Sequence, residues 1–143
     1  MIKVTFYDEI EDSKIDFAVI VARTDGKWVF CKHKERETFE IPGGHREKGE
    51  AIDEAAKREL YEETGALEYE ISRLGIYSVM VDDNKETESF GMLYYADIFK
   101  FEGELHSEIE KIIITEDLVE SWTYPEIQPK LIERWQHLKS WLI

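Results

Sequence analysis

The sequence has 143 residues, 43% of them hydrophobic and 13% aromatic, so it can bury one core and we expect a single domain over residues 1–143. Its 18 basic and 32 acidic side chains give a formal net charge of −14, which excludes a general binder of long polyanions but permits a phosphate site built on a metal ion. With no apolar stretch near the ~20 residues of a membrane span, no secretory signal in residues 1–10 and a single cysteine, Cys31, the chain is predicted to be cytoplasmic.

The first predicted elements are two strands and a glycine-containing loop. Phe17–Ala22 and Trp28–Cys31 are unbroken apolar runs, and Thr24-Asp25-Gly26 between them has turn chemistry, so each run is predicted to be a strand. Phe39-Glu40-Ile41 alternates and then stops at Pro42-Gly43-Gly44, where glycine permits backbone conformations closed to other residues. We therefore expect a special loop at the glycines.

A helix and a long hairpin follow. Residues 51–64 are rich in Ala, Glu, Leu, Lys and Arg and end at Gly65, the position expected for a C-terminal cap, which predicts a helix. Ile71–Val81 and Ser89–Phe101 carry β-branched and aromatic residues around the turn-like Asp82-Asp83-Asn84, which predicts two paired strands.

The last predicted elements are a short strand and a closing helix. Ile112–Thr115 is typical of a strand. Beyond Pro129, apolar residues recur at spacings of three and four, which predicts an amphipathic helix; they are Leu131, Ile132, Trp135, Leu138, Trp141 and Leu142. Because strands and helices are interleaved, the fold class predicted is a mixed α/β layered domain.

The helix over residues 51–64 has an apolar face that becomes acidic. At ~100° per residue, this face carries Ile52, Ala55, Ala56 and Glu59, continued by Glu62 and Glu63. Three carboxylates near a helix C-terminus repel one another and the helix dipole, and carboxylate oxygens are what Mg²⁺ or Mn²⁺ binds, so a divalent metal site is predicted. The alternative is that these acids only solubilise the helix end. Gly43-Gly44 shortly upstream favour the metal, because glycine lets a backbone carbonyl approach an ion closely.

The segment Gly44–Ala66 resembles the signature of the Nudix hydrolases. It has Gly44, five residues, Glu50, seven residues and then the run Arg58-Glu59-Leu60-Tyr61-Glu62-Glu63-Thr64-Gly65-Ala66. Every charged and glycine position of the signature matches, and the one departure is Ala66, where a larger aliphatic residue is usual. The resemblance implies the Nudix fold, a mixed β-sheet sandwiched between helices (α/β/α).

The resemblance also implies an activity and roles for residues. It implies hydrolysis of a nucleoside diphosphate linked to another group, by water attack on phosphorus with Mg²⁺ or Mn²⁺ as cofactor. The implied metal ligands are Glu59, Glu62 and Glu63, with the carbonyl of Gly43 as a further contact. Gly44, Glu50 and Arg58 are then supporting residues that hold the loop and helix together. Glu59 is the safer candidate for the catalytic base, and Glu108, with Glu110 second, is the candidate acid outside the signature.

The basic residues before the glycines are candidates for binding substrate phosphates. They are Lys32, His33, Lys34 and Arg36, whose alternative role is that of exposed charges at a strand end. The run from Lys27 to Gly44 resembles the YtkD-like branch of MutT-like Nudix proteins, which implies an oxidised guanine nucleoside triphosphate or the 5′ end of an RNA as substrate. The net charge favours the mononucleotide, because a chain of this charge makes few contacts with a long phosphate backbone.

Three questions stay open at this stage. Trp122, Tyr124 and Tyr77 are either base-stacking or core residues. The other functional class is a non-catalytic Nudix-fold module that senses nucleotides, although the three glutamates that such modules commonly lose are present here. Base specificity and oligomeric state, monomer or homodimer, are not fixed by the sequence.

Overall fold

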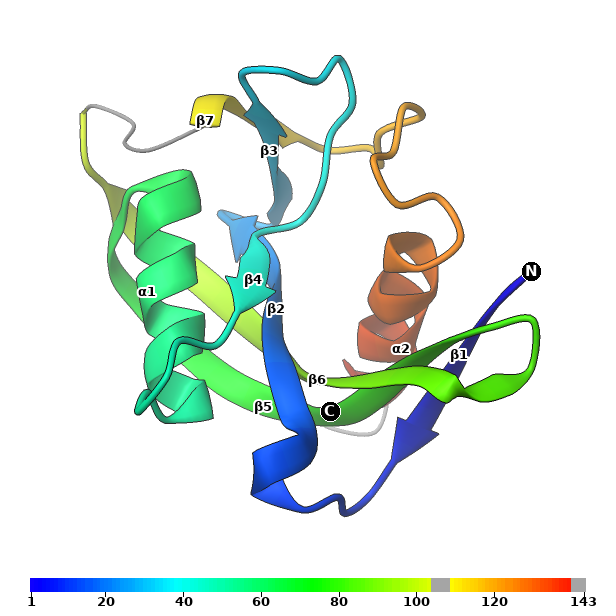
Figure 1. Ribbon diagram of the computed structural model, residues 1–143. Helices are drawn as coiled ribbons and strands as arrows, with labels where there is room; N and C mark the ends of the chain where they lie inside the picture. The colour runs from blue at the N-terminus through cyan, green and yellow to red at the C-terminus, as the bar shows by residue number, and fades with distance from the viewer. Residues whose placement is uncertain (104–108, 140–143) are drawn as a thin grey trace.

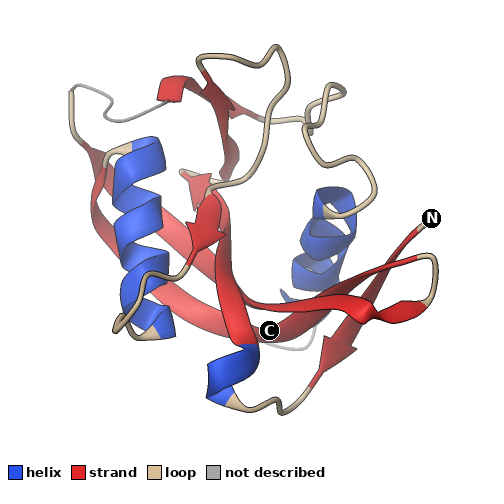
Figure 2. Cartoon of the chain, viewed as in Figure 1, coloured by secondary structure: helices blue, strands red, loops and turns tan. Residues whose placement is uncertain are grey.

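The protein is described by a computed structural model that covers residues 1–103 and 109–139. Its elements in chain order are β1 (Ile2–Tyr7), the 3₁₀ turn η1 (Asp12–Lys14), β2 (Ile15–Thr24), β3 (Lys27–His33), β4 (Gly43–His45), α1 (Ile52–Thr64), β5 (Ala66–Val81), β6 (Asn84–Phe101), β7 (Ile109–Thr115) and α2 (Gln128–Lys139). Figure 2 shows these strands and helices interleaved along the chain. No helix in the described ranges is long and apolar enough to cross a membrane.

One mixed sheet contains all the strands of the described ranges. Its main order is β1-β5-β6-β2-β3-β7, and β4 pairs with β2 beside this path. The central strands β2 and β6 run parallel, and the other pairs are antiparallel. The mixed α/β fold expected from the sequence is confirmed.

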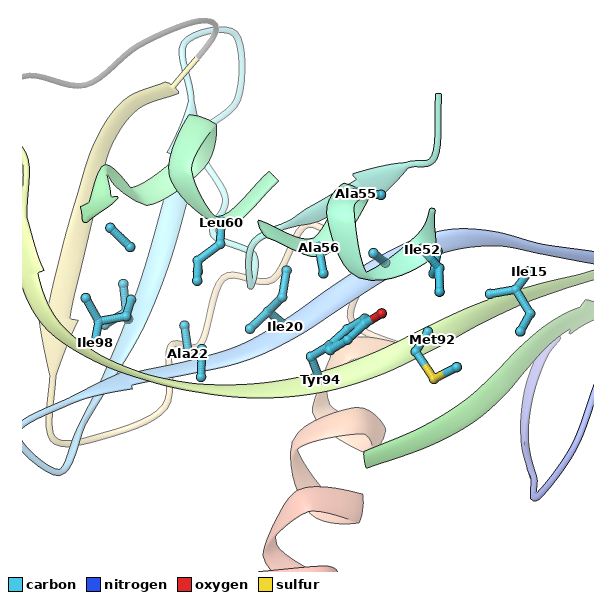
Figure 3. Close-up of a cluster of buried hydrophobic side chains, with 14 of the residues drawn as sticks. Ile15, Ile20, Ala22, Ile52, Ala55, Ala56, Leu60, Met92, Tyr94 and Ile98 are labelled. Atoms are coloured by element: carbon cyan, nitrogen blue, oxygen red, sulfur yellow. The ribbon is translucent and has the colours of Figure 1, made fainter. Parts of the chain in front are cut away.

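The sheet is buried on both faces because neighbouring side chains of a strand point to opposite sides. In β2, Ile20 packs with the residues of α1, whereas Val21 packs with those of α2. Figure 1 shows the two helices on opposite sides of the central strands. Figure 3 shows the cluster on the α1 side, where Ile52 and Leu60 of the helix face Tyr94 and Ile98 of β6. This two-sided burial explains why β2 and β3 read as continuous apolar runs.

The first helix ends where the sequence predicts. Gly65 has φ 76° and ψ 17°, the left-handed conformation that glycine adopts at low cost, and its N–H donates to the carbonyl of Tyr61. At the other end, the Glu54 carboxylate accepts a hydrogen bond from the N–H of Ala51 at 3.1 Å. The helix therefore begins at Ile52, and its three signature acids lie in its last two turns.

Several element boundaries differ from the sequence prediction. Strand β1 is an addition, β5 begins at Ala66 rather than Ile71, and β6 begins at Asn84 rather than Ser89. The hairpin turn is confined to Asp82 and Asp83, both with positive φ, so pairing continues closer to the turn than expected. Of the predicted closing helix, Trp141 and Leu142 lie outside the described residues.

The expected loop at the glycines is instead the short strand β4. Gly43 and Gly44 do not have positive φ, so they are not used for an unusual backbone conformation. They are needed for space: a Cβ on Gly43 would lie 2.6 Å from the carbonyl oxygen of Ala18, and one on Gly44 would lie 2.6 Å from the Glu59 carboxyl carbon. Glycine therefore allows β4 to lie close to both β2 and α1.

Candidate functional site

Glu63 is the most buried of the signature acids. Its Oε1 accepts a hydrogen bond from the N–H of Gly43 at 2.7 Å, and its Oε2 lies 3.2 Å from Nε2 of His33. Burial raises the pKa of Glu63 to about 8, against the opposing effect of the Gly43 hydrogen bond, and the neighbouring Glu59 and Glu40 raise it further. The fold thus holds a carboxyl group in a place that disfavours its charge.

Glu59 lies directly over Gly44 and is held from the side by Arg58. Nη1 of Arg58 donates to Oε1 of Glu59 at 2.8 Å. The pKa of Glu59 is raised, first because the group is half-buried, although Arg58 acts in the opposite direction. Glu62 is more exposed, and its Oε2 lies 3.3 Å from Nη1 of the same arginine. One guanidinium therefore contacts two of the three acids.

Arg58 also fixes the approach to the helix. Its Nε and Nη2 donate to the two carboxylate oxygens of Glu50 at 2.7 and 3.0 Å, and its Nη2 donates to the carbonyl of His45 at 3.1 Å. These hydrogen bonds lower the pKa of Glu50 to about 2. The planar guanidinium binds both oxygens at once, a geometry that a lysine cannot reproduce. The structure thus places Glu50 and Arg58 as the sequence implied, between the loop and α1.

A second buried acid, Glu40, lies beside Glu63 through His33. Nε2 of His33 is 2.6 Å from Oε1 of Glu40, and Nη1 of Arg36 is 3.5 Å from Oε2. The 2.6 Å contact is not aligned as a hydrogen bond, so Glu40 Oε1 is a buried acceptor without a donor. Burial raises the pKa of Glu40, and His33 and Arg36 counteract part of that effect.

A cavity of about 460 Å³ adjoins these groups. One end is polar and is lined by His33, Arg36, Glu40 and Glu63 together with Gly43 and Gly44. The rest is mainly apolar and aromatic, lined by Phe17, Val19, Ile41, Tyr77, Val79, Tyr124, Ile127 and Leu131, with Ser89 and Gln128 as polar exceptions. A ligand with one anionic end and one flat apolar end matches this division.

The cavity separates the four basic candidates into two pairs. His33 and Arg36 line it, whereas Lys32 is buried within β3 and Lys34 is exposed on the loop after β3, and neither is among the lining residues. Of the aromatic candidates, Tyr77 and Tyr124 line the cavity, while Trp122 packs edge-on against Phe30 with ring centroids 5.4 Å apart. Glu108 lies outside the described residues, and Glu110 lies on β7.

The donor set fits a divalent cation, although no cage is preassembled. In residues 1–103 and 109–139, no three Asp, Glu, His or Cys side chains are gathered in a way that would hold a metal ion. However, Glu59 and Glu63 supply hard oxygen ligands, and the mutual repulsion that raises their pKa values is what a divalent cation relieves. The side chains of Glu59 and Glu62 would turn from Arg58 to bind it.

The sequence reasoning missed two residues of the site. Glu40 was treated only as part of a strand, and Gln128 only as a residue before the last helix; both are buried and line the cavity. A signal for Glu40 was available: an acid in an alternating apolar stretch next to the two glycines is an unusual choice for a strand.

Comparison with known proteins identifies the family. The profile of the NUDIX domain matches residues 12–138, which is most of the chain. This chain belongs to the NUDIX family. The match includes the whole of α1 and β4, so the acids and glycines described above stand at the positions of the NUDIX signature.

Similar NUDIX proteins are found by sequence and by structure. YtkD of Bacillus subtilis, which bears the provisional name 8-oxo-dGTP diphosphatase, is 36% identical over 101 residues, covering 71% of this chain and 61% of YtkD. ADP-ribose pyrophosphatase of Methanocaldococcus jannaschii is 39% identical over 61 residues, covering 41% of this chain and 36% of that protein. The chain thus aligns with less than two thirds of the length of these relatives. The crystal structure of the Bacillus subtilis pyrophosphohydrolase BsRppH superposes with a TM-score of 0.77 and 26% identity, over 95% of this chain and 90% of that one.

Proposed function

We propose that this protein is a metal-dependent pyrophosphohydrolase that cleaves a nucleoside triphosphate of the dGTP or 8-oxo-dGTP type. The observation that carries the proposal is the shared cavity: Glu63 and Gly43 of the NUDIX signature line the polar end of a space whose other walls are apolar and aromatic. A nucleotide has the same two parts, a charged phosphate chain and a flat base. The resemblance to YtkD supports the choice of base, and the resemblance to BsRppH supports the reaction.

In this reaction the protein binds, orients and moves a proton rather than forming a covalent bond. Glu63, fixed by Gly43 and His33, Glu59, and the more exposed Glu62 would hold the metal ion, with the carbonyl of Gly43 as a further contact. Mg²⁺ or Mn²⁺, when bound, supplies charge neutralisation for the phosphates and lowers the pKa of a water molecule. Glu59 is suited to accept the proton of the attacking water, because its raised pKa brings it nearer to neutral pH.

The basic residues and the aromatic wall would then divide the substrate between them. Arg36 and His33 lie where they can contact phosphate oxygens, and Tyr77 and Tyr124 lie where a base can stack. The alternative substrate, an RNA 5′ end, would enter the same cavity with its first nucleotide. The alternative class, a nucleotide sensor, would bind the ligand there without turning it over. A cytoplasmic location agrees with nucleotide substrates, and whether the protein acts as a monomer or a homodimer does not alter these roles.

The test is a hydrolysis panel with a matched variant. Wild type, Glu63→Gln and the control Glu116→Gln, an exposed acid that does not line the cavity, are assayed with Mg²⁺, with Mn²⁺ and after chelation. The substrates are dGTP, 8-oxo-dGTP, ADP-ribose and a short RNA with a 5′ triphosphate. Glutamine keeps an oxygen for the Gly43 N–H but removes the charge, so folding is preserved while metal binding is weakened.

We expect wild type and Glu116→Gln to cleave a guanine nucleotide only with metal, and Glu63→Gln to lose most of that activity. Mn²⁺ should also raise the melting temperature of the wild type and not that of Glu63→Gln. Preferred cleavage of the RNA end would replace the mononucleotide as substrate. Nucleotide binding without any cleavage would refute the enzyme and leave the sensor.

A further inference from the structure

Gln128, the first residue of α2, is the buried polar group on the apolar side of the cavity. Only 6% of its surface is exposed, yet it lines the cavity together with Ile127 and Leu131. A buried carboxamide has two N–H donors and an acceptor oxygen to satisfy. Its place in the middle of an apolar wall therefore needs an explanation.

The orientation of this carboxamide is fixed by the backbone of the neighbouring segment. Oε1 of Gln128 accepts a hydrogen bond from the N–H of Ile41 at 2.8 Å. A backbone N–H can be paired only with the oxygen of the amide, so the NH₂ group must take the other position. The amide cannot flip without leaving the buried Ile41 N–H without a partner, which is costly.

The NH₂ group borders the open cavity. In the described part of the chain, Nε2 of Gln128 makes no hydrogen bond, and the buried side-chain atoms sealed off without a partner are Arg23 Nε and Glu40 Oε1. Nε2 is therefore not sealed off, and the open space that Gln128 lines is the cavity. The result is a donor without an acceptor, held in one direction and pointing into the site.

This donor lies at a suitable distance from the metal-binding end for one nucleotide to reach both. Ile41 N–H anchors Gln128 and Gly43 N–H anchors Glu63, and these two residues are two positions apart. In an extended backbone that separation is about 6.6 Å, since each residue advances ~3.3 Å. A base that contacts Gln128 therefore leaves the phosphates of the same nucleotide on the Glu63 side.

We infer that Gln128 determines base specificity by donating its fixed N–H to a ring carbonyl oxygen of the substrate, so that oxo bases are preferred to the corresponding amino bases. This inference rests on the proposed function, since it concerns the base end of the same cavity. Ser89 also lines the wall, but a hydroxyl group rotates and serves equally as donor or acceptor, so it does not discriminate. An amino group facing the fixed NH₂ of Gln128 would leave both donors without an acceptor.

The experiment compares substrate pairs that differ in one carbonyl. The pairs are dGTP with the 2,6-diaminopurine deoxynucleoside triphosphate, dUTP with dCTP, and 8-oxo-dGTP with dGTP. Each is measured as kcat/KM with Mg²⁺ and, separately, as Kd by calorimetry on the Glu63→Gln protein. In the wild type at least one pair should favour the carbonyl member by about 5- to 150-fold, the range for a buried donor left unpaired.

Two variants of the same position separate recognition from folding. Gln128→Glu keeps an oxygen for Ile41 N–H and replaces the donor by an acceptor, and its charge is favoured at the helix N-terminus. Gln128→Met removes both groups. Gln136→Glu makes the same chemical change on an exposed position of α2 and serves as the control. We expect Gln128→Glu to reduce the discriminating ratio to one or below, Gln128→Met to reduce it to about one, and Gln136→Glu to leave it unchanged.

The outcomes distinguish this inference from the proposed function. Ratios near one in the wild type, or ratios that Gln128→Glu does not change, overturn the inference even if hydrolysis is rapid. Base-dependent Kd values without hydrolysis overturn the proposed function and leave the inference standing. A structural role of Gln128 alone would lower the melting temperature of Gln128→Met while all three ratios stayed as in wild type.

Discussion

Replacing Gly43 by alanine tests whether the close contact between β4 and β2 holds the site together. The added Cβ would lie 2.6 Å from the carbonyl oxygen of Ala18 and 2.9 Å from Cα of Val19. Both are backbone atoms of the central strand, so β4 must move away by about 0.8 Å to reach an ordinary contact of 3.4 Å. Overpacking of this kind costs about 1–3 kcal/mol. For a chain of this size, 2 kcal/mol corresponds to a fall in melting temperature of roughly 4–8 °C.

The same displacement acts on Glu63. A shift of 0.8 Å along the 2.7 Å hydrogen bond from Gly43 N–H lengthens it to about 3.5 Å, beyond the useful range for N–H···O. We therefore expect Gly43→Ala to lose both stability and metal-dependent hydrolysis.

Two other glycines serve as matched controls. A Cβ on Gly44 would meet only the end of the Glu59 side chain, which can rotate away, so Gly44→Ala should lose activity with a stability change under about 1 kcal/mol. A Cβ on Gly103 would meet nothing within 4 Å, and its φ is not positive, so Gly103→Ala should be neutral or slightly stabilising.

The assay is urea unfolding of the three variants and the wild type, with hydrolysis measured on the same preparations. The reasoning predicts a separation: stability falls only in Gly43→Ala, and activity falls in Gly43→Ala and Gly44→Ala. If Gly43→Ala unfolds within 0.5 kcal/mol of Gly103→Ala, a difference within the ordinary range of surface substitutions, the close packing of β4 on β2 does not have the importance assigned to it.

Three further predictions concern the helix, the core and the pH dependence. Arg58→Lys loses the paired hydrogen bonds to Glu50, and calorimetry should show Mn²⁺ affinity lower by about 10- to 100-fold; unchanged affinity would contradict the positioning role. Leu60→Ala, at a fully buried position of α1, should cost about 2–5 kcal/mol in urea unfolding. The hydrogen bond from Arg73 lowers the pKa of Asp53, so this carboxylate stabilises the fold above its unfolded pKa and ceases to do so as pH falls through its folded pKa. Since both side chains are about half exposed, Asp53→Asn should cost under about 1 kcal/mol near neutral pH and nothing at low pH, as urea unfolding from pH 3 to 7 would show.

Local patterns predict the fold well where burial determines residue choice. The strand runs in β2 and β3 are apolar because both faces of the sheet are covered, and Gly65 marks the end of α1 because its φ is positive. Strand β1 was not predicted, because its register is set by pairing with β5, from Ile2 opposite Val81 to Tyr7 opposite Ile76. A pairing over more than 60 residues of sequence leaves no local signal.

The site was predictable in its acids and not in its cavity. Residues at fixed spacing on one helix share a face, so Glu59 and Glu63 could be placed from the sequence. The cavity combines residues from β2, β3, β5 and α2, and its polar members Glu40 and Gln128 are 88 positions apart and joined only through the segment around Ile41. Likewise, Lys32 and Arg36 look equivalent in the sequence, but only Arg36 lines the cavity, because side chains alternate along β3 and Lys32 is buried there.

The segment Glu40–Gly44 determines how the two ends of a ligand would be related. Its backbone is tied to the sheet through Glu40 with Cys31 and through Pro42 with Ile20, so it has little freedom to shift. From this fixed segment, Ile41 N–H orients Gln128 of α2 and Gly43 N–H orients Glu63 of α1, although the two helices lie on opposite sides of the central strands. The spacing between a base-reading group and a metal-binding group is therefore set by two peptide units of one short segment and does not depend on packing between the helices. This arrangement explains why an alanine at Gly43 is expected to affect the chemistry while the altered side chain itself contacts no substrate.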